Sequence, residues 1–163
     1  MATQDLEQFI TDFVEHIWNQ QNYDKLGDFL HDDYLTHRSD GTVKGIDTFR
    51  KLVSQFHHSY PDLNVEIDNV VGSGDKVSGT YVFEGTMEED FGSLKATGEH
   101  IRLEGSFFSR LKDGKLFENV NRWDNLNMMI QLGLIEPPKG LESVEDVLES
   151  QEFEETGERR PGV

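Results

Sequence analysis

One carboxylate, Asp124, stands where a strand pattern ends and a helix pattern begins, directly after Trp123. At the mouth of a pocket, apolar neighbours would raise the pKa of such a carboxyl group and suit it to general acid/base catalysis. As the N-cap of a helix over 125–133, the same group would instead accept backbone N–H bonds that keep it ionised. Spacing alone leaves both interpretations open.

The hairpin around Gly114 decides which side chains share a face with Asp124. A two-residue turn is one option, and a three-residue loop over 112–114, which pairs Leu111 with Lys115, is the one we favour. In that register one face carries His100, Arg102, Glu104, Ser106, Phe108, Arg110, Leu116, Glu118, Val120, Arg122 and Asp124. A core face would not tolerate so many charges, so we expect a cavity face. A solvent-exposed sheet face with ion pairs is the alternative.

Other chemistries lack the residues that they need. The chain has no cysteine, which excludes disulfides, thiol nucleophiles and Cys-type zinc sites. His57 and His58 are adjacent on a predicted helix and point about 100° apart, so they cannot chelate one ion together. The sequence contains no His-x-x-x-His, His-Glu-x-x-His or Gly-x-Ser-x-Gly motif. We therefore expect no metal.

The elements that position these residues follow from hydrophobic periodicity. Apolar residues at three- and four-residue steps predict helices over about 4–20, 24–31 and 45–60, the last ended by Pro61. Alternation then predicts strands over about 63–67, 77–86, 99–111 and 115–123, before the helix over 125–133. Helices that precede an antiparallel meander indicate an α+β fold. Three helices on a curved, mostly antiparallel sheet would form a cone that encloses a pocket.

Length and charge limit the partners. Of the 163 residues, 1–135 read as one domain and 136–163 as an acidic extension that is partly disordered or forms one short helix near 141–148. The formal net charge of −17 repels phosphate backbones and anionic lipid, so we expect no nucleic acid and no membrane partner. The chain shows neither a signal-peptide pattern nor an apolar run near the roughly 18 residues of a membrane span. We expect a cytoplasmic protein.

Several short motifs recur in order along the chain. They are FLHDDYLTH at 29–37, GTVKG at 41–45, YPDL at 60–63, ATG at 96–98, DGKLFE at 113–118, WDNL at 123–126 and QLG at 131–133. Over about residues 5–135 their order and spacing resemble the SnoaL-like polyketide cyclase (ester cyclase) family, within the nuclear transport factor 2-like superfamily. The resemblance implies a cone fold and a homodimer or higher homo-oligomer that associates through the outer sheet face.

The resemblance also implies a reaction. Cyclases of this family close a ring of a polyketide ester by an intramolecular aldol-type condensation, without metal or cofactor, and one Asp that matches Asp124 acts as general acid/base. His37 matches a polar pocket residue near the end of the short first strand. The sequence departs from the family at Arg110, where cyclases carry a histidine, and at Val120, where they carry a tryptophan. Arg110 stays protonated at neutral pH, so it would stabilise an enolate or hold a carboxylate.

Three functions therefore remain open. The first is acid/base catalysis on a small hydrophobic carbonyl compound, with Asp124, His37 and Arg110 as catalytic residues. The second is a binding protein without chemistry, and the third is a hydrolase or isomerase on the same cone. In each case we expect the pocket lining to include Arg122, Glu118, Val120, Phe108, His100, Trp18 and Tyr34.

Overall fold

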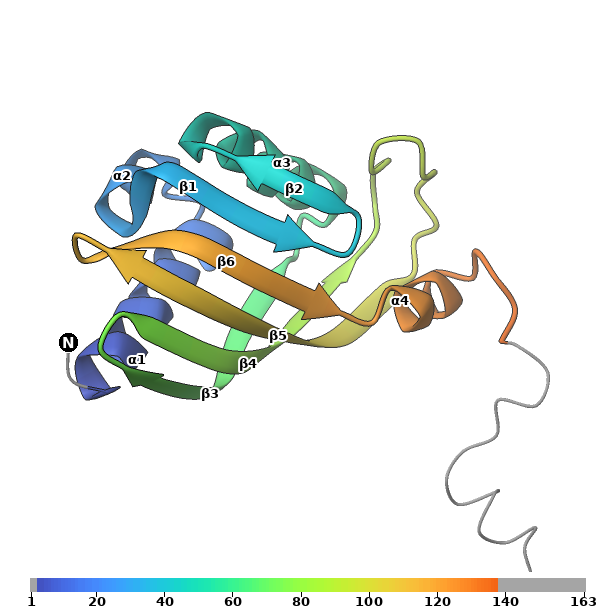
Figure 1. The fold of residues 1–163 in the computed structure, drawn as a ribbon. Helices are drawn as coiled ribbons and strands as arrows, with labels where there is room; N and C mark the ends of the chain where they lie inside the picture. The colour runs from blue at the N-terminus through green and yellow to red at the C-terminus, as the bar shows by residue number, and fades with distance from the viewer. Residues whose placement is uncertain (1–2, 138–163) are drawn as a thin grey trace, which may run out of the picture.

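Six strands form one open, curved sheet in the computed structural model, which describes residues 3–137 (Figure 1). The strands are β1 (Leu30–Arg38), β2 (Gly41–Lys44), β3 (Asn64–Ser73), β4 (Lys76–Thr86), β5 (His100–Lys112) and β6 (Lys115–Trp123). Their order is β2-β1-β6-β5-β4-β3, and neighbours are antiparallel except β1 and β6, which are parallel. The expected mostly antiparallel sheet is confirmed.

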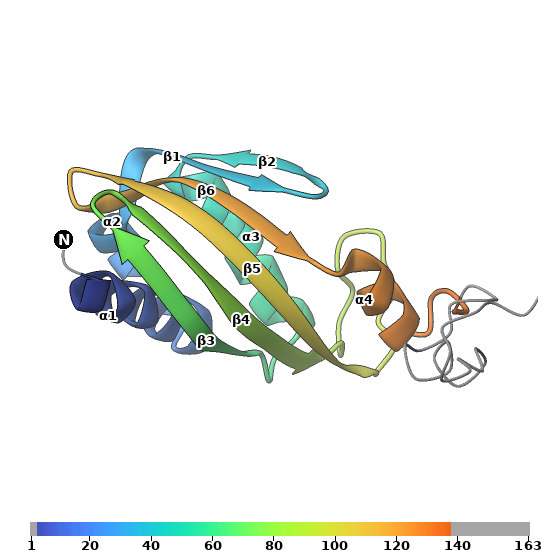
Figure 2. The same ribbon diagram turned by 60° about the horizontal axis from the view of Figure 1, so that its bottom comes forward.

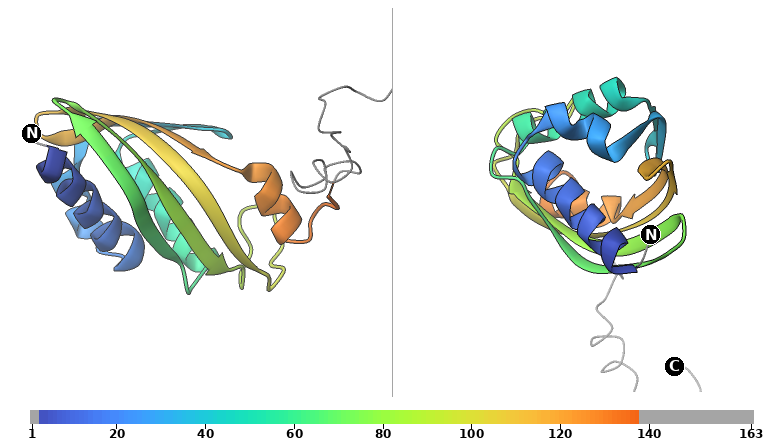
Figure 3. Two further views of the ribbon diagram at one scale, coloured as in Figure 1. Left: turned by 90° about the horizontal axis from the view of Figure 1, so that it is seen from below. Right: turned by 90° about the vertical axis from the view of Figure 1, so that its left-hand side faces the viewer.

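Helices cover the inner face of this sheet, and a last one lies at its end, after β6 (Figure 2). They are α1 (Thr3–Phe13), which continues as a π-helix (Val14–Asn19), a 3-10 turn (Tyr23–Lys25) that leads into α2 (Leu26–Phe29), then α3 (Ile46–Ser59) and the closing α4 (Asn125–Gln131). Figures 2 and 3 show α1, α2 and α3 on one side of the sheet, which curves around them. This is the α+β cone that the sequence predicts. No helix in the described part of the chain is long and apolar enough to cross a membrane.

The core forms where the apolar side of the first helical segment packs against the inner face of the sheet. Leu6, Ile10 and Ile17 project from the first helical segment, and each is at most 3% exposed. On β5, buried residues alternate strictly with exposed ones, and the buried set is odd-numbered. Ile101 and Leu103 are fully buried. The apolar residues therefore determine that the odd-numbered face of β5 points toward the helices.

The β5–β6 hairpin differs from the expected loop. Asp113 and Gly114 both have positive φ, at 52° and 75°, and Lys112 pairs with Lys115, so the turn has two residues. The three-residue loop is therefore wrong. A β-bulge follows, because Leu111 pairs with Leu116 whereas Arg110 pairs with Glu118. The extra residue restores the parity that the longer loop would have given, although Leu116 turns to the inner face and is buried.

Two side-chain amides complete hydrogen bonding where a strand has no neighbour. Asn19 donates from Nδ2 to the carbonyl of Val65 (3.0 Å) and accepts the N–H of Val65 at Oδ1 (2.9 Å), on the open edge of β3. Gln131 does the same for Arg102, with distances of 3.0 and 2.8 Å. Arg102 lies beyond the point where β6 stops pairing with β5. Each amide replaces one residue of a missing strand.

The C-terminal extension and its short helix near 141–148 lie outside the described residues. The division of the chain into a domain over 1–135 and an extension over 136–163 therefore stays a prediction.

Candidate functional site

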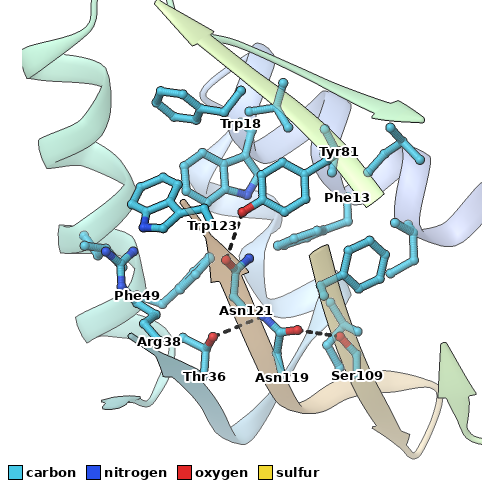
Figure 4. A pocket seen from close by; sticks show the side chains of 18 of the residues that line it. Phe13, Trp18, Thr36, Arg38, Phe49, Tyr81, Ser109, Asn119, Asn121 and Trp123 are labelled. Carbon is cyan, nitrogen blue, oxygen red and sulfur yellow. Dashed lines mark hydrogen bonds between the residues drawn. The ribbon is translucent and has the colours of Figure 1, made fainter. Parts of the chain in front are cut away.

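A pocket of about 90 Å³ lies between the helices and the inner face of the sheet. Its lining is mainly aromatic and aliphatic: Phe13, Trp18, Tyr34, Phe49, Tyr81, Phe83, Phe107 and Trp123 with Ile10, Val14, Leu52, Val65, Ile67 and Leu116. The polar groups of the lining are Thr36, Arg38, Ser109, Asn119 and Asn121. Figure 4 shows that they come from the adjacent strands β1, β6 and β5.

We call Thr36, Arg38, Ser109, Asn119 and Asn121 the polar strip of the pocket, and strand alternation produces it. Asn119, Asn121 and Trp123 are alternate residues of β6, so their side chains share the inner face. The hydroxyl of Tyr81 donates to Oδ1 of Asn121 (2.9 Å). Asn119 accepts a hydrogen bond from Ser109 (2.8 Å) and donates one to Thr36 (3.1 Å), as the dashed lines in Figure 4 mark.

Burial changes the acidity of the phenols. It raises the pKa of Tyr81, while the hydrogen bond to Asn121 opposes the rise. Burial also raises the pKa of Tyr34, which is 2% exposed. Both phenols therefore stay protonated near neutral pH, and they can donate hydrogen bonds but cannot serve as ready bases.

Arg38 carries the only formal charge at neutral pH among the described residues that line the pocket. Its Nε and Nη2 donate to the two carboxylate oxygens of Asp40, at 2.8 and 2.9 Å. Its guanidinium carbon lies 5.3 Å from the ring centroid of Trp123 and 5.5 Å from that of Phe56. Arg38 also holds the pKa of Asp40 below its usual value. The cation thus lies beside two rings that contact each other and is paired with one carboxylate.

Two glycines make room for the aromatic lining. Gly105 pairs with Tyr81 across β4 and β5, and Gly79 pairs with Phe107. A Cβ at Gly105 would lie 2.3 Å from Cζ of Tyr81, and one at Gly79 would lie 2.8 Å from Phe107. Each ring therefore lies over the backbone of the opposite glycine.

The structure places two of the predicted lining residues, Trp18 and Tyr34, in the pocket. The side chains of Phe108, Arg110, Glu118, Val120 and Arg122 alternate with the lining residues and occupy the opposite, outer face. The expected cavity face is therefore the outer face of the sheet. The reason is that Ile101, Leu103 and Phe107 of β5 are apolar and buried, and they determine which face meets the helices.

The outer face has the ion pairs of the alternative interpretation. Arg110 pairs with Glu118, and Nε2 of His37 lies 3.0 Å from Oε1 of Glu118. The hydrogen bonds from Arg110 and then His37 hold the pKa of Glu118 below its usual value. His100 is exposed and hydrogen-bonds to Thr86 (3.0 Å). These residues are not brought together with the polar strip of the pocket.

Asp124 is the N-cap of α4. Its side chain accepts the N–H of Asn127 at 2.9 Å, which is the capping interpretation. The residue is exposed and lines an open hollow of about 520 Å³ on the outer face together with Arg102 and Arg122. Trp123, its neighbour in the chain, points to the pocket instead. The catalytic role of Asp124 stays a prediction.

Six polar residues of the pocket were not singled out from the sequence: Thr36, Arg38, Tyr81, Ser109, Asn119 and Asn121. The available signal was alternation, because Asn-x-Asn-x-Trp at 119–123 and Thr-x-Arg at 36–38 each place polar groups on the face of an aromatic or buried neighbour. The lining holds no Asp, Glu or His among the described residues. Within residues 3–137, no three His, Asp or Glu side chains are grouped so that they could hold a metal ion.

Comparison with solved structures identifies relatives of this fold. A candidate SnoaL-like polyketide cyclase from Jannaschia sp. CCS1 is 19% identical, with a TM-score of 0.73 over 83% of this chain and 95% of the other. TsrD from Streptomyces laurentii is 20% identical, with a TM-score of 0.74 over 83% and 99%. IdmH from Streptomyces antibioticus, a candidate polyketide cyclase, is 23% identical, with a TM-score of 0.68 over 78% and 97%. At these identities the likeness establishes the fold.

A search of curated proteins finds no match. The family model for SnoaL-like polyketide cyclases matches residues 8–132, which includes every strand and the whole pocket lining. The chain therefore belongs to the SnoaL-like polyketide cyclase family.

Proposed function

We propose that this protein binds a small, largely apolar compound with a carbonyl oxygen in the pocket between helices and sheet. The composition of the lining carries this proposal, because aromatic and aliphatic side chains surround a few groups that donate hydrogen bonds. Within residues 3–137, Nη1 of Arg38 and Nδ2 of Asn121 have no hydrogen-bond partner. A carbonyl oxygen needs donors of this kind, and the rest of such a ligand needs apolar walls.

The size of the pocket narrows the ligand class. A dry cavity of about 150 Å³ takes one benzene molecule, whereas the pocket here has about 90 Å³. The pocket is therefore smaller than a benzene cavity, so we expect the ligand to have at most one small ring and to enter as lining side chains move aside.

Family membership favours a second candidate, which is proton transfer at the carbon next to that carbonyl, as in an aldol-type ring closure. Arg38 and Asn121 would stabilise the negative charge that develops on the enolate oxygen. Removal of the proton needs a base, and the sequence offers Asp124 for that role. His37 would be a further polar catalytic group, and Arg110 would stabilise the enolate. Because these three residues lie outside the lining, the geometry supports binding more strongly than catalysis.

One experiment with acetophenone separates the two candidates. Trp18 and Trp123 both line the pocket, so their fluorescence should report saturable binding of this single-ring ketone. In D2O, an enzyme that forms an enolate exchanges the methyl hydrogens of acetophenone for deuterium, which NMR detects, whereas a binding protein leaves them in place. If exchange occurs and Asp124→Asn slows it by about 10²- to 10⁴-fold, Asp124 is the acid/base. Absence of saturable binding would refute the proposal.

We also propose that two copies associate through the outer sheet face. Phe108 is 46% exposed there and is the cross-strand partner of Val120, which gives this otherwise charged face an apolar centre. An exposed apolar patch with a polar rim is typical of protein interfaces.

A further inference from the structure

We propose that Asp40 makes the pocket selective for uncharged ligands. Because Asp40 is paired with Arg38, the pocket binds neutral carbonyl compounds and rejects carboxylates. The inference rests on the proposed binding function and names the ligand class of that same pocket.

The position of Asp40 follows from a tight turn. Arg38 pairs with Gly41 at the end of the β1–β2 hairpin, so Ser39 and Asp40 form a two-residue connection. This connection holds the Asp40 carboxylate beside the Nε–Nη2 edge of Arg38, where both oxygens accept hydrogen bonds. The Nη1 group remains on the other edge of the guanidinium.

The aromatic rings around Arg38 strengthen every charge interaction at this point. The guanidinium lies beside the indole of Trp123, as Figure 4 shows, and close to Phe56. The Arg38 side chain is only 14% exposed, whereas that of Asp40 is 61% exposed. Charges in such surroundings interact more strongly than they would in water. Without Asp40, Arg38 would be a poorly solvated cation that a ligand carboxylate could neutralise.

With Asp40 in place, the charges of Arg38 and Asp40 cancel, and the pocket presents no net positive charge to a ligand. A ligand carboxylate would leave water for apolar walls, and it would gain an arginine that already has a counter-ion and meet the negative charge of Asp40. A neutral carbonyl oxygen meets neither cost, because it only accepts a hydrogen bond from Nη1 of Arg38 or Nδ2 of Asn121. The net charge of −17 on the whole chain adds to the repulsion of anions.

Acetophenone and benzoate test this selectivity, because they have the same ring and differ mainly in charge. Dissociation constants come from tryptophan fluorescence at pH 7 with the full chain. We expect the wild-type protein to bind acetophenone at least tenfold more tightly than benzoate. We expect Asp40→Asn to tighten benzoate binding at least tenfold and to change acetophenone binding less than twofold. Asp33→Asn, which removes the same charge from the exposed part of β1, should change neither constant.

The dependence on Arg38 provides a further readout. In Asp40→Asn/Arg38→Gln the gain in benzoate affinity should disappear, because no cation remains to be neutralised. The inference is overturned if the wild-type protein binds benzoate as tightly as acetophenone, a result that needs no variant to fold. It is also overturned if Asp40→Asn leaves the ratio of the two constants unchanged. If neither probe binds the wild-type protein, the proposed binding function itself is refuted.

Discussion

Replacing Gly105 by alanine tests whether the aromatic lining depends on the glycines opposite it. The new Cβ would lie 2.3 Å from Cζ and 2.5 Å from the hydroxyl oxygen of Tyr81. Atoms in ordinary van der Waals contact lie about 3.5–4.0 Å apart, so the ring has to move by more than about 1 Å. The movement would break the hydrogen bond from Tyr81 to Asn121 and change the pocket wall.

The expected loss of stability has two opposing parts. Overpacking of this kind costs about 1–3 kcal/mol, and the lower entropy of alanine in the unfolded chain returns about 0.4–1 kcal/mol. Taking the middle of each range, the net loss is about 1.3 kcal/mol. With a urea m value of about 2 kcal/mol/M, the midpoint of unfolding should fall by about 0.6 M.

Gly27→Ala is the matched control, because a Cβ at that helical position meets no atom within 4 Å. Since alanine favours a helix over glycine by up to about 1 kcal/mol, the urea midpoint of this variant should stay the same or rise. Tryptophan fluorescence follows both unfolding and acetophenone binding, and we expect Gly105→Ala to weaken the binding as well. In a Tyr81→Leu background the Gly105→Ala change should cost almost nothing. Equal midpoints for the two single alanine variants would refute the reasoning.

Two further predictions concern pH and association. Burial lowers the pKa of His57 from its usual 6.5, while its Nε2–H bond to the carbonyl of Trp18 opposes the effect. The unfolded chain therefore binds more protons than the folded chain below about pH 7. The free energy of unfolding should then fall as pH drops from about 7 to 5.5. Urea midpoints across this range should fall less steeply in His57→Gln, and equal slopes would contradict the assignment. Light scattering should give twice 18.7 kDa for the wild-type protein and a monomer for Phe108→Lys. A monomeric wild type would disprove association through the outer sheet face.

Helical periodicity and strand alternation were sufficient to predict most elements. The helix predicted over 45–60 is α3, and the one over 125–133 begins at Asn125 as α4. The helix predicted over 4–20 keeps its apolar stripe, but its second half is a π-helix, for which the sequence carries no recognised signal. Strand β1 is longer than expected and β2 was not predicted. β1 does not alternate between buried and exposed residues, and its parallel partner β6 is distant in sequence.

The candidate site was harder to predict than the fold, because one strand offers two faces with different chemistry. On β5 charged residues such as Arg110 lie on the even-numbered face, whereas Ile101, Leu103 and Phe107 mark the odd-numbered face as buried. Apolar residues decide the orientation of a half-buried strand, and charges follow. The two-residue turn with its bulge has the same parity as a three-residue loop, so the hairpin sequence alone does not distinguish them.

The amides of Asn19 and Gln131 have a consequence for how this molecule behaves in a crowded cell. An unpaired edge strand can form hydrogen bonds with a strand of another chain, and such extension of the sheet leads to aggregation. Here a single side chain occupies the backbone donor and acceptor of Val65, and another those of Arg102, without any lengthening of the sheet. The sheet can thus remain open around its pocket and still offer no free backbone groups to another chain's strand at these two residues.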